Sequence, residues 1–343
     1  MRVLVTGASG FVGSHTVAAL LEAGHTPRAL VRDPAKATRA LEAAGADPAR
    51  VELVTGDMLD ETAVGRALEG CRAAIHAAAA VGVTGRGGDL VEVNLGGTRN
   101  VVGGAVERGL DPVVHVSTVA VFVPPRDPVI TVDGPLASPR TAYGRSKVAA
   151  ERYVRRLQDQ GAPVTVVYPG GVCGPHQPVL DSLMEGLVGA LRLVWPLPPG
   201  GVGVIDVRDL AEALARALVP GRGPRRWLLG GHYLTWRQCS DLCRELTGVR
   251  HRRLPVPGGA LRAAGTLLDA LRRVRPFDYP LTRDAAEFMT RLVPTDDRPA
   301  LEELGMKLRP VEQTLSDALR WLAEAGHLDP RKAGRLAPPA EEH

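Results

Sequence analysis

The chain has 343 residues, of which 45% are hydrophobic and 23% are charged. Because a single hydrophobic core rarely grows past about 250–300 residues, this length predicts one large core with a smaller attached lobe. The formal charge of +4 comes from arginines spread among nearly as many carboxylates, which disfavours nucleic acid as a partner.

Export, membrane-spanning and metal-binding signals are not found in the sequence. No window of about 18 uncharged apolar residues occurs, and no basic stretch followed by an apolar one opens the chain, so we expect a cytoplasmic protein without a membrane span. No metal site is predicted, because the cysteines are scattered without nearby histidines. The four cysteines are Cys71, Cys173, Cys239 and Cys243.

Short β-branched runs alternate with longer helical patterns through the first 168 residues. This alternation predicts an α/β fold with a doubly wound parallel sheet, the Rossmann architecture, and a dinucleotide-binding domain over residues 1–168. The predicted strands are Arg2–Thr6, Thr26–Val31, Val51–Thr55, Ala73–Ala77, Pro112–Ser117 and Val164–Tyr168, and the predicted helices include Val12–Ala23, Asp89–Arg108 and Thr141–Gln160.

Beyond Tyr168 the pattern loosens into a smaller, mostly helical C-terminal substrate lobe. The Pro- and Gly-rich region from 169 to 203 suits loops around a pocket, interrupted by a helix at Val179–Leu193. A strand at Gly203–Asp206, a helix at Arg208–Leu218 and a strand at Trp227–Leu229 predict that residues 203–230 return to the sheet. The lobe, residues 169–202 and 231–328, is therefore interleaved, and residues 329–343 are expected to form a loose tail.

The stretch Gly259–Arg275 predicts a helix that is basic on one face and apolar on the other. Two interpretations stay open. The helix covers the substrate lobe, which is the commoner role, or it makes weak peripheral contact with a membrane surface.

A glycine motif follows the first predicted strand and opens the first helix. In this GxxGxxG spacing, Gly7 allows a sharp turn, Gly10 lets the backbone approach a pyrophosphate, and Gly13 permits close packing of helix on strand. Strand, turn and helix in this order predict a dinucleotide site, which we expect to include Ser9, Phe11 and Val12 as well.

The end of the second strand predicts which dinucleotide binds. Where an acidic residue would bind the ribose 2′-hydroxyl of NAD, the chain has Val31 and then Arg32, with Lys36 beyond. Since Arg32 is placed to bind a 2′-phosphate, we expect NADP(H) as the cofactor, with Arg32 and Lys36 as contacts. Asp33, which precedes Pro34, is expected to be a turn residue.

Small residues follow the third and fourth strands, where they would let the cofactor pass close to the backbone. Gly56 comes directly after the third strand, and an alanine run follows the fourth. The residues expected to line the cofactor here are Asp57, Met58, Ala77, Ala78 and Ala79.

Tyr143 and Lys147 lie four residues apart at the start of a long predicted helix, and hence on one face of it. A phenol is a general acid or base, and a nearby cation would lower its pKa toward a useful range. Ser117 and Thr118 end a buried-looking strand at the carboxyl edge, where parallel sheets bind ligands, so their hydroxyls are candidates for binding a carbonyl or alcohol oxygen.

The chain resembles the extended short-chain dehydrogenase/reductase family, the NAD-dependent epimerase/dehydratase superfamily, over roughly its first 210 residues. The resemblance implies that Tyr143, Lys147 and Thr118 are catalytic with Ser117 beside them, and that Tyr143 and Lys147 also contact the cofactor, with Lys147 on the nicotinamide ribose. It implies too that Asn94 braces the sheet and that the protein is a homodimer. The matching segments are Thr6–Gly13, Gly56–Asp57, Ala77–Ala79, Asn94–Thr98, Ser117–Thr118, Tyr143–Lys147, Tyr168–Pro175 and Val207–Leu210, of which Pro169 and Val172 are implied cofactor contacts.

Two departures narrow the resemblance to one branch of the family. Val119 and Ala120 stand where sugar dehydratases carry an Asp-Glu pair, and Gly171 stands where members that bind nucleotide sugars usually carry Asn. The segment around Gly171 is more similar to dihydroflavonol reductases and 3β-hydroxysteroid dehydrogenases, which implies reduction of a small, largely apolar carbonyl compound, or oxidation of the alcohol. A nucleotide-sugar epimerase with retained nicotinamide and a non-catalytic NADP(H) sensor remain as alternatives.

Overall fold

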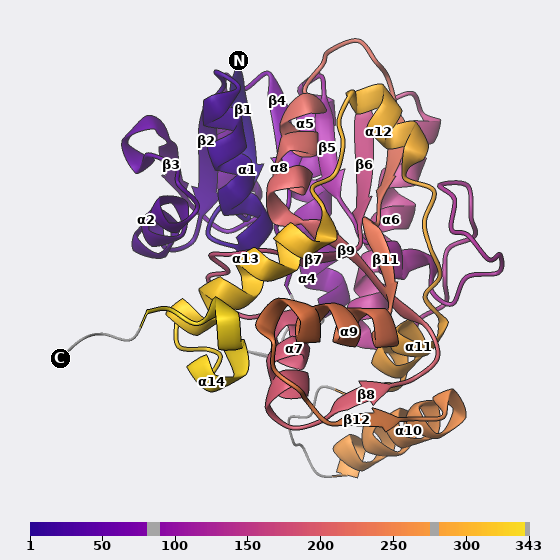
Figure 1. Cartoon of the computed structure of the whole chain (residues 1–343). Coiled ribbons are helices and arrows are strands. Elements are labelled where there is room, and N and C mark those ends of the chain that lie inside the picture. Colours follow the sequence, from indigo (N-terminus) through magenta and orange to yellow (C-terminus); the bar gives the residue numbers. More distant parts are fainter. Residues whose placement is uncertain (81–89, 275–280, 340–343) are drawn as a thin grey trace.

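Seven parallel strands form the central sheet, in the order β10-β6-β5-β4-β1-β2-β3 (Figure 1). The computed structural model describes residues 1–80, 90–274 and 281–339. The strand order reverses between β1 and β4, which is where open parallel sheets bind dinucleotides. The strands are β1 (Arg2–Thr6), β2 (Thr26–Val31), β3 (Glu52–Thr55), β4 (Ala73–His76), β5 (Val113–Val116), β6 (Val164–Pro169) and β10 (Arg225–Leu229).

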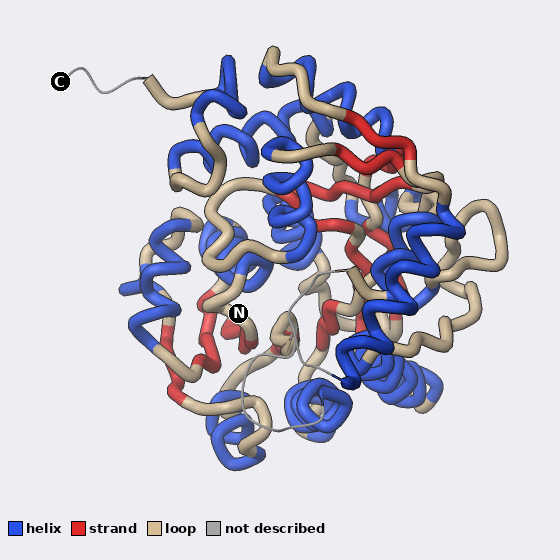
Figure 2. The backbone as a smooth tube through the Cα atoms, turned by 90° about the horizontal axis from the view of Figure 1, so that it is seen from below, coloured by secondary structure: helices blue, strands red, loops and turns tan. Residues whose placement is uncertain are grey.

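Helices cover both faces of this sheet (Figure 2). One face packs through a core that includes Val5, Leu20 and Leu214, and the other through Leu4, Val101 and Val154, all of them fully buried. The first face carries α1 (Phe11–Glu22), α2 (Pro34–Ala43), α8 (Val207–Arg216) and α12 (Arg298–Leu304). The second carries α3 (Glu61–Leu68), α4 (Leu90–Thr98), the π-helical turn Arg99–Gly103, α5 (Gly104–Glu107) and α6 (Ala142–Asp159). The predicted doubly wound α/β fold is thereby confirmed.

The second lobe has its own core, in which Met184, Trp195 and Leu319 are buried. A three-stranded sheet of order β11-β9-β7 and a parallel pair β12-β8 line it. These strands are β7 (Gly171–Cys173), β8 (Trp195–Leu197), β9 (Gly201–Asp206), β11 (His232–Thr235) and β12 (Arg253–Pro255). The helices are α7 (Ser182–Arg192), α9 (Trp236–Thr247), α10 (Gly258–Val274), α11 (Arg283–Arg291), α13 (Val311–Glu324) and α14 (Pro330–Ala333).

Two sequence expectations about this lobe were wrong. The predicted strand at Gly203–Asp206 does not rejoin the main sheet, because β5 and β10 already occupy both edges of β6, and β9 pairs with β7 and β11 instead. The predicted strand at Trp227–Leu229 does rejoin the sheet, as part of β10. The tail is ordered at its start: Asp329 caps α14 by accepting from the Arg331 amide, and Ala333 is fully buried in the lobe core. A short side chain suits a helix that packs this closely.

Three predicted segments reach beyond the described residues, at Asp89, Arg275 and residues 340–343. Within the described parts, no helix combines the length and the apolar character that crossing a bilayer requires.

Candidate cofactor and active site

The turn between β1 and α1 is packed against the end of β4. Gly7 has a φ of 82°, and a Cβ atom there would lie 2.8 Å from the Ala78 amide nitrogen, so only glycine fits. The Gly10 amide donates to the Gly7 carbonyl at 2.8 Å, and a Cβ on Gly13 would overlap that same carbonyl. The helix N-terminus is thereby held over the turn, which is a cradle of the kind that binds pyrophosphate.

The residues after the turn stay accessible. Ser9, Gly10, Phe11 and Val12 are half-buried at the N-terminus of α1, whereas Gly13 is buried. The Phe11 ring packs edge-on against His15, with ring centroids 5.2 Å apart. A dinucleotide bound here would meet backbone amides rather than a filled core.

The end of β2 is open to solvent. The Arg32 side chain is 82% exposed, and the ion pair that it forms with Asp57 is long at 3.8 Å. Lys36 is exposed in the first turn of α2, and its amide donates to the Asp33 carboxylate at 3.0 Å. Asp33 is thus the cap of α2, as expected of a turn residue, and the two cations, Arg32 and Lys36, lie exposed at the end of β2 and the start of α2.

The backbone after β3 and β4 is held from the α4 side. The Asn100 amide donates to the Met58 carbonyl at 3.0 Å, and Asp57 accepts from the Leu59 amide at 2.9 Å. Across the sheet, the Ala77 amide donates to the Thr6 carbonyl at 3.3 Å, while the residues Ala77–Ala79 are half-buried. These contacts leave the small side chains lining the floor of the cradle.

Tyr143 and Lys147 lie in the first two turns of α6. Thr141 caps this helix by accepting from the Gly144 amide at 3.1 Å, and the Asp284 carboxylate of α11 in turn accepts from the Thr141 amide at 2.8 Å. The start of the helix is therefore fixed both by its own cap and by the second lobe.

Burial shifts the pKa values of both Tyr143 and Lys147. Desolvation and then the nearby Asp181 carboxylate raise the pKa of Tyr143 to about 12. Desolvation lowers the pKa of Lys147 to about 8, against the opposing effect of Glu151. The expectation that Lys147 depresses the pKa of Tyr143 is not met, because the cost of charging a buried phenol dominates and Lys147 is not among the groups that shift this pKa.

Asn94 joins the end of β4 to the first turn of α6. Its side chain accepts from the Ala80 amide at 2.7 Å and donates to the Ala80 carbonyl at 3.1 Å and to Ser146 Oγ at 2.8 Å. Ser146 then donates to the Tyr143 carbonyl at 2.7 Å. This chain of bonds gives Asn94 the bracing role that the resemblance implies.

A buried carboxylate, Glu151, lies one turn after Lys147. It accepts from Ser117 Oγ at 2.9 Å, from the Tyr168 hydroxyl at 2.5 Å and from Arg155 Nε at 2.8 Å. The Ser117 hydroxyl therefore binds α6 to the end of β5. Sequence reasoning missed Glu151 because an acid four residues after a lysine is also the ordinary pattern of an exposed helical pair.

Thr118 follows directly and has a different environment. It is half-buried and caps the 3₁₀ turn Val119–Phe122, where its Oγ1 accepts from the Ala120 amide at 3.2 Å. As an acceptor in this bond, the hydroxyl still has its own proton to donate to an oxygen in the site.

The histidines beside the motifs serve packing. His76 shares a hydrogen bond with Thr6 at 2.8 Å and stacks on His115, with ring centroids 5.5 Å apart. Burial lowers the pKa of His76 to about 3, with Lys147 adding to the effect, so this ring is neutral at physiological pH. His15 donates to the Phe11 carbonyl at 3.0 Å.

The segment after β6 closes the far side of the site. Pro169 is the last residue of β6, and Val172 lies half-buried in β7. A Cβ atom on Gly171 would lie 2.8 Å from Leu183 Cδ2 and 3.0 Å from the Gly203 carbonyl oxygen. No larger side chain fits at position 171 unless α7 or β9 moves.

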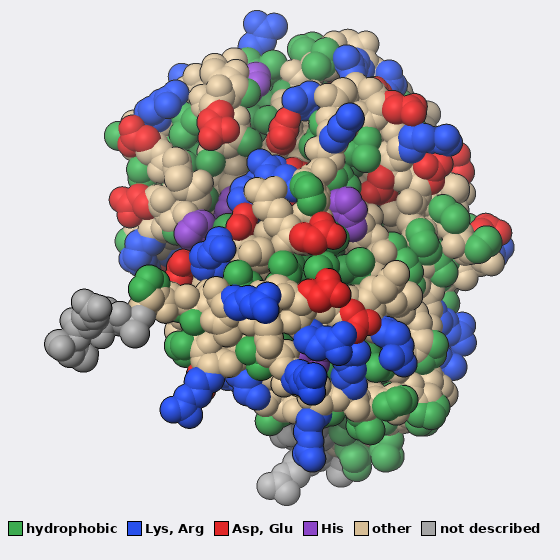
Figure 3. Space-filling model, viewed as in Figure 1, with side chains coloured by type: hydrophobic (Ala, Val, Ile, Leu, Met, Phe, Trp, Pro, Cys, Tyr) green, Lys and Arg blue, Asp and Glu red, His purple; other side chains and the backbone are tan. Residues whose placement is uncertain are grey.

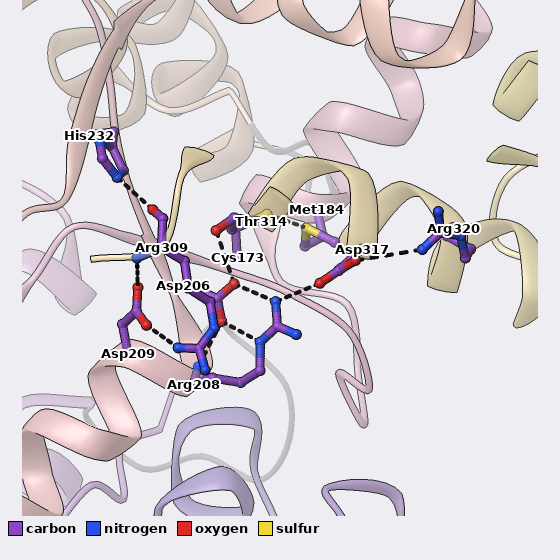
Figure 4. Close-up of polar contacts among 10 residues, drawn as sticks. All are labelled: Cys173, Met184, Asp206, Arg208, Asp209, His232, Arg309, Thr314, Asp317 and Arg320. Atoms are coloured by element: carbon purple, nitrogen blue, oxygen red, sulfur yellow. Dashed lines mark hydrogen bonds and ion pairs between the residues drawn. The ribbon is translucent and has the colours of Figure 1, made fainter. Parts of the chain in front are cut away.

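A polar network ties the C-terminal segment to the first turn of α8 (Figure 4). Arg208 donates to Asp206 and to Asp317 of α13, both at 2.7 Å, and Thr314 donates to Asp206 at 2.9 Å. The Arg309 amide donates to Asp209 at 2.7 Å, and its guanidinium pairs with the same carboxylate. The hydrogen bonds and charge of Asp206 raise the pKa of Arg208. Among the described residues, no group of three His, Cys, Asp or Glu could hold a metal ion.

Comparison with known proteins identifies the family. The model of the NAD dependent epimerase/dehydratase family matches residues 3–230. The chain belongs to this family, the extended short-chain dehydrogenase/reductases. It is 31% identical to "Sterol demethylase protein B" of Methylococcus capsulatus, over 95% of this chain and 99% of that protein. It is 30% identical to a 4-hydroxy-2-methyl-3-oxo-4-farnesyl-3,4-dihydroquinoline-1-oxide ketoreductase of Stigmatella aurantiaca, over 95% of this chain and 98% of that one.

Two solved structures that are similar to this chain cover nearly its whole length. The structure of gox2253 matches with a TM-score of 0.77 at 25% identity, covering 96% of this chain and 99% of that one. MoeE5 in complex with UDP-glucuronic acid and NAD matches with a TM-score of 0.70 at 25% identity, covering 95% of this chain and 100% of that one. Similarity therefore extends over both lobes.

Proposed function

We propose that this protein is an NADP(H)-dependent oxidoreductase that reduces the ketone or aldehyde of a small, largely apolar substrate, or oxidises the corresponding alcohol. The observation that carries the proposal is the position of Tyr143 and Lys147, one turn apart at the start of α6, which Asn94 and Ser146 join to the end of β4 beside the glycine cradle. Membership in an NAD(P)-dependent family and similarity to a ketoreductase support the same chemistry.

The cradle fits a dinucleotide, since only glycine can occupy position 7 and the first amides of α1 stay accessible. When bound, NADPH would supply the hydride. The residues Ser9–Gly13, Met58, Ala77–Ala79, Pro169 and Val172 would hold it, and Arg32 and Lys36 would bind its 2′-phosphate.

The catalytic groups of the chain are suited to proton transfer. With its pKa raised to about 12, Tyr143 keeps its proton at neutral pH and would donate it to the carbonyl oxygen. Lys147, with a pKa of about 8, is still mostly charged at pH 7 and would stabilise the phenolate that forms. Thr118 would orient the carbonyl, while Ser117, bonded to Glu151, positions the strand that carries Thr118.

Position 171 favours an apolar substrate over a nucleotide sugar. A buried diphosphate needs several donors, because an unpaired buried charge costs several kcal/mol. The Gly171 backbone is packed so closely that an asparagine side chain could not be added there without movement of Leu183 or β9.

The test follows NADPH absorbance with aromatic, alicyclic and steroid-like ketones, while UDP- and dTDP-sugars are titrated against the NADPH-loaded protein by calorimetry. Stoichiometric NADPH oxidation by an apolar ketone without sugar-nucleotide heat is the expected result. Micromolar sugar-nucleotide binding with retained, unconsumed nicotinamide would establish an epimerase instead, and binding of NADPH without any turnover a sensor.

We also propose a cytoplasmic homodimer. The four cysteines are all buried free thiols, as suits a reducing compartment, and α4 and α6 pack side by side as a pair that a second copy could extend into a four-helix interface. Sedimentation equilibrium tests the dimer.

A further inference from the structure

Exposed apolar side chains are concentrated at one end of the second lobe. Within the described residues, nine large hydrophobic side chains are exposed, and five of them belong to the segments around β8, β12 and α10. They are Leu193, Val194, Leu254, Leu267 and Leu271, with exposures of 77%, 38%, 53%, 60% and 48%. Soluble proteins normally expose such residues singly, so this grouping marks an interaction surface.

The segments that carry these side chains are neighbours in the fold. In the parallel pair of β8 and β12, Leu254 lies opposite Pro196, and the Trp195 amide donates to the Arg252 carbonyl at 2.8 Å. The chain then runs directly into α10, at the lower edge of Figure 1. We name this patch, made of Leu193, Val194, Leu254, Leu267 and Leu271, the apolar end.

Helix α10 exposes one apolar stripe, while its other two leucines, Leu261 and Leu268, are half-buried. It contacts α11 through Gly265, whose Cβ position lies 2.7 Å from the Thr282 carbonyl oxygen, and through Asp269, which accepts from the Arg283 amide at 3.0 Å. The exposed positions Ala260, Ala263, Leu267, Ala270 and Leu271 recur every three to four residues along one face. A helix that only covered the lobe would bury this face.

Arginines border the apolar end. Arg250 and Arg252 are exposed in the segment that leads into β12, and Arg237 and Arg244 are exposed on α9. Two carboxylates lie among these arginines, Asp241 and the exposed Glu245. Asp241 pairs with both Arg253 at 2.7 Å and Arg244 at 3.2 Å, and the arginines still leave an excess of positive charge. Figure 3 shows Lys and Arg side chains gathered in the lower middle of this face, with hydrophobic surface to their right.

We propose that the apolar end and its arginine border dock on an anionic lipid bilayer, with α10 lying in the plane of the interface. Exposed leucines would enter the acyl boundary while the arginines bind lipid phosphates, which is how an interfacial amphipathic helix binds. The charge excess favours a lipid surface over a second copy of this chain, because two such borders would repel each other.

The surface is connected to the candidate active site. Helix α10 packs on α11, and Asp284 of α11 accepts from the Thr141 amide, two residues before Tyr143. The proposal extends the proposed function, since a bilayer is the natural store of apolar carbonyl compounds. Its test is therefore made without substrate.

The experiment measures co-sedimentation of the full chain with vesicles of phosphatidylcholine alone and with added phosphatidylglycerol. We expect binding to the anionic vesicles that weakens as salt rises from about 0.1 to 0.5 M. The double variant Leu267→Asp/Leu271→Asp should lose at least about tenfold in partitioning. Arg250→Gln and Arg252→Gln should each lose roughly fivefold on anionic vesicles.

The matched control is Val219→Asp, which changes a valine that is 40% exposed and lies outside the apolar end. This control variant should bind vesicles as well as the unchanged chain does. All variants should also oxidise NADPH with a water-soluble ketone at the rate of the unchanged chain. This assay tests the proposed function separately from membrane binding. Equal binding to neutral and anionic vesicles, or an unaffected double variant, would overturn the proposal. So would a dimer in solution that the double variant separates into monomers, since the face would then be a contact between copies.

Discussion

The two ends of the candidate site differ in how they are built. At the β5–α6 end, Glu151 is completely buried and accepts from three side chains within 2.9 Å. At the β2 end, the Arg32 side chain is 82% exposed and its ion pair with Asp57 is 3.8 Å long. The proposed catalytic residues at the start of α6 are therefore held in place by the protein itself. The proposed 2′-phosphate ligand Arg32 has few contacts with the protein, so a bound cofactor would have to fix its position.

The sharpest test at the buried end is Tyr143→Phe. General acid–base groups contribute about 10²–10⁴-fold, so turnover should fall by that order while NADPH affinity stays nearly unchanged. Steady-state kinetics and a fluorescence titration of NADPH measure the two quantities. Near-normal turnover would exclude Tyr143 as the proton donor.

At the exposed end, Arg32→Ala should remove a preference for NADPH over NADH. A charge-assisted hydrogen bond of about 1.5–3 kcal/mol corresponds to a change on the order of 10–100-fold in the ratio of the two affinities. Isothermal titration with each cofactor gives this ratio. Arg237→Ala, which removes an exposed arginine of α9 outside the cradle, serves as the matched control and should leave the ratio intact. An unchanged ratio in Arg32→Ala would contradict the 2′-phosphate contact.

The comparison also predicts different effects on stability. Glu151→Gln removes the charge that Arg155, Tyr168 and Ser117 share, so the free energy of unfolding should fall by about 1–3 kcal/mol. The exposed Arg32→Ala should change it by less than about 0.5 kcal/mol. Urea unfolding measures both variants, and equal losses would show that the buried network adds no special stability.

The smallest expected effect on activity near neutral pH comes from the ionisation of Lys147. Its pKa is lowered to about 8 by burial, so the charge is present below that pH and is lost as the pH rises through it. The kcat/KM of the free enzyme should therefore decline above about pH 8. In Lys147→Arg, which stays charged, this decline should vanish whatever the remaining rate, and its persistence would assign the decline to another group.

Much of the fold, and the glycine turn of the candidate site, could be predicted from short stretches of sequence. The strands Arg2–Thr6 and Thr26–Val31 begin and end as predicted, because β-branched runs bounded by glycine and charge specify short buried strands. The turn at Gly7 could also be inferred, since its conformation depends on the residue itself. Fold and family could thus be predicted from the amino-acid sequence.

The remaining features depend on contacts between distant residues. Glu151 meets Ser117 across 34 positions, and Asp284 reaches the Thr141 amide across 143, so no local pattern marks them. Strand β9 could not pair with β6, because β5 and β10 already pair with both edges of that strand. The exposure of Leu267 and Leu271 on α10 was likewise decided by how Gly265 and Asp269 pack on α11, since helical periodicity specifies that a face is apolar but not what lies against it.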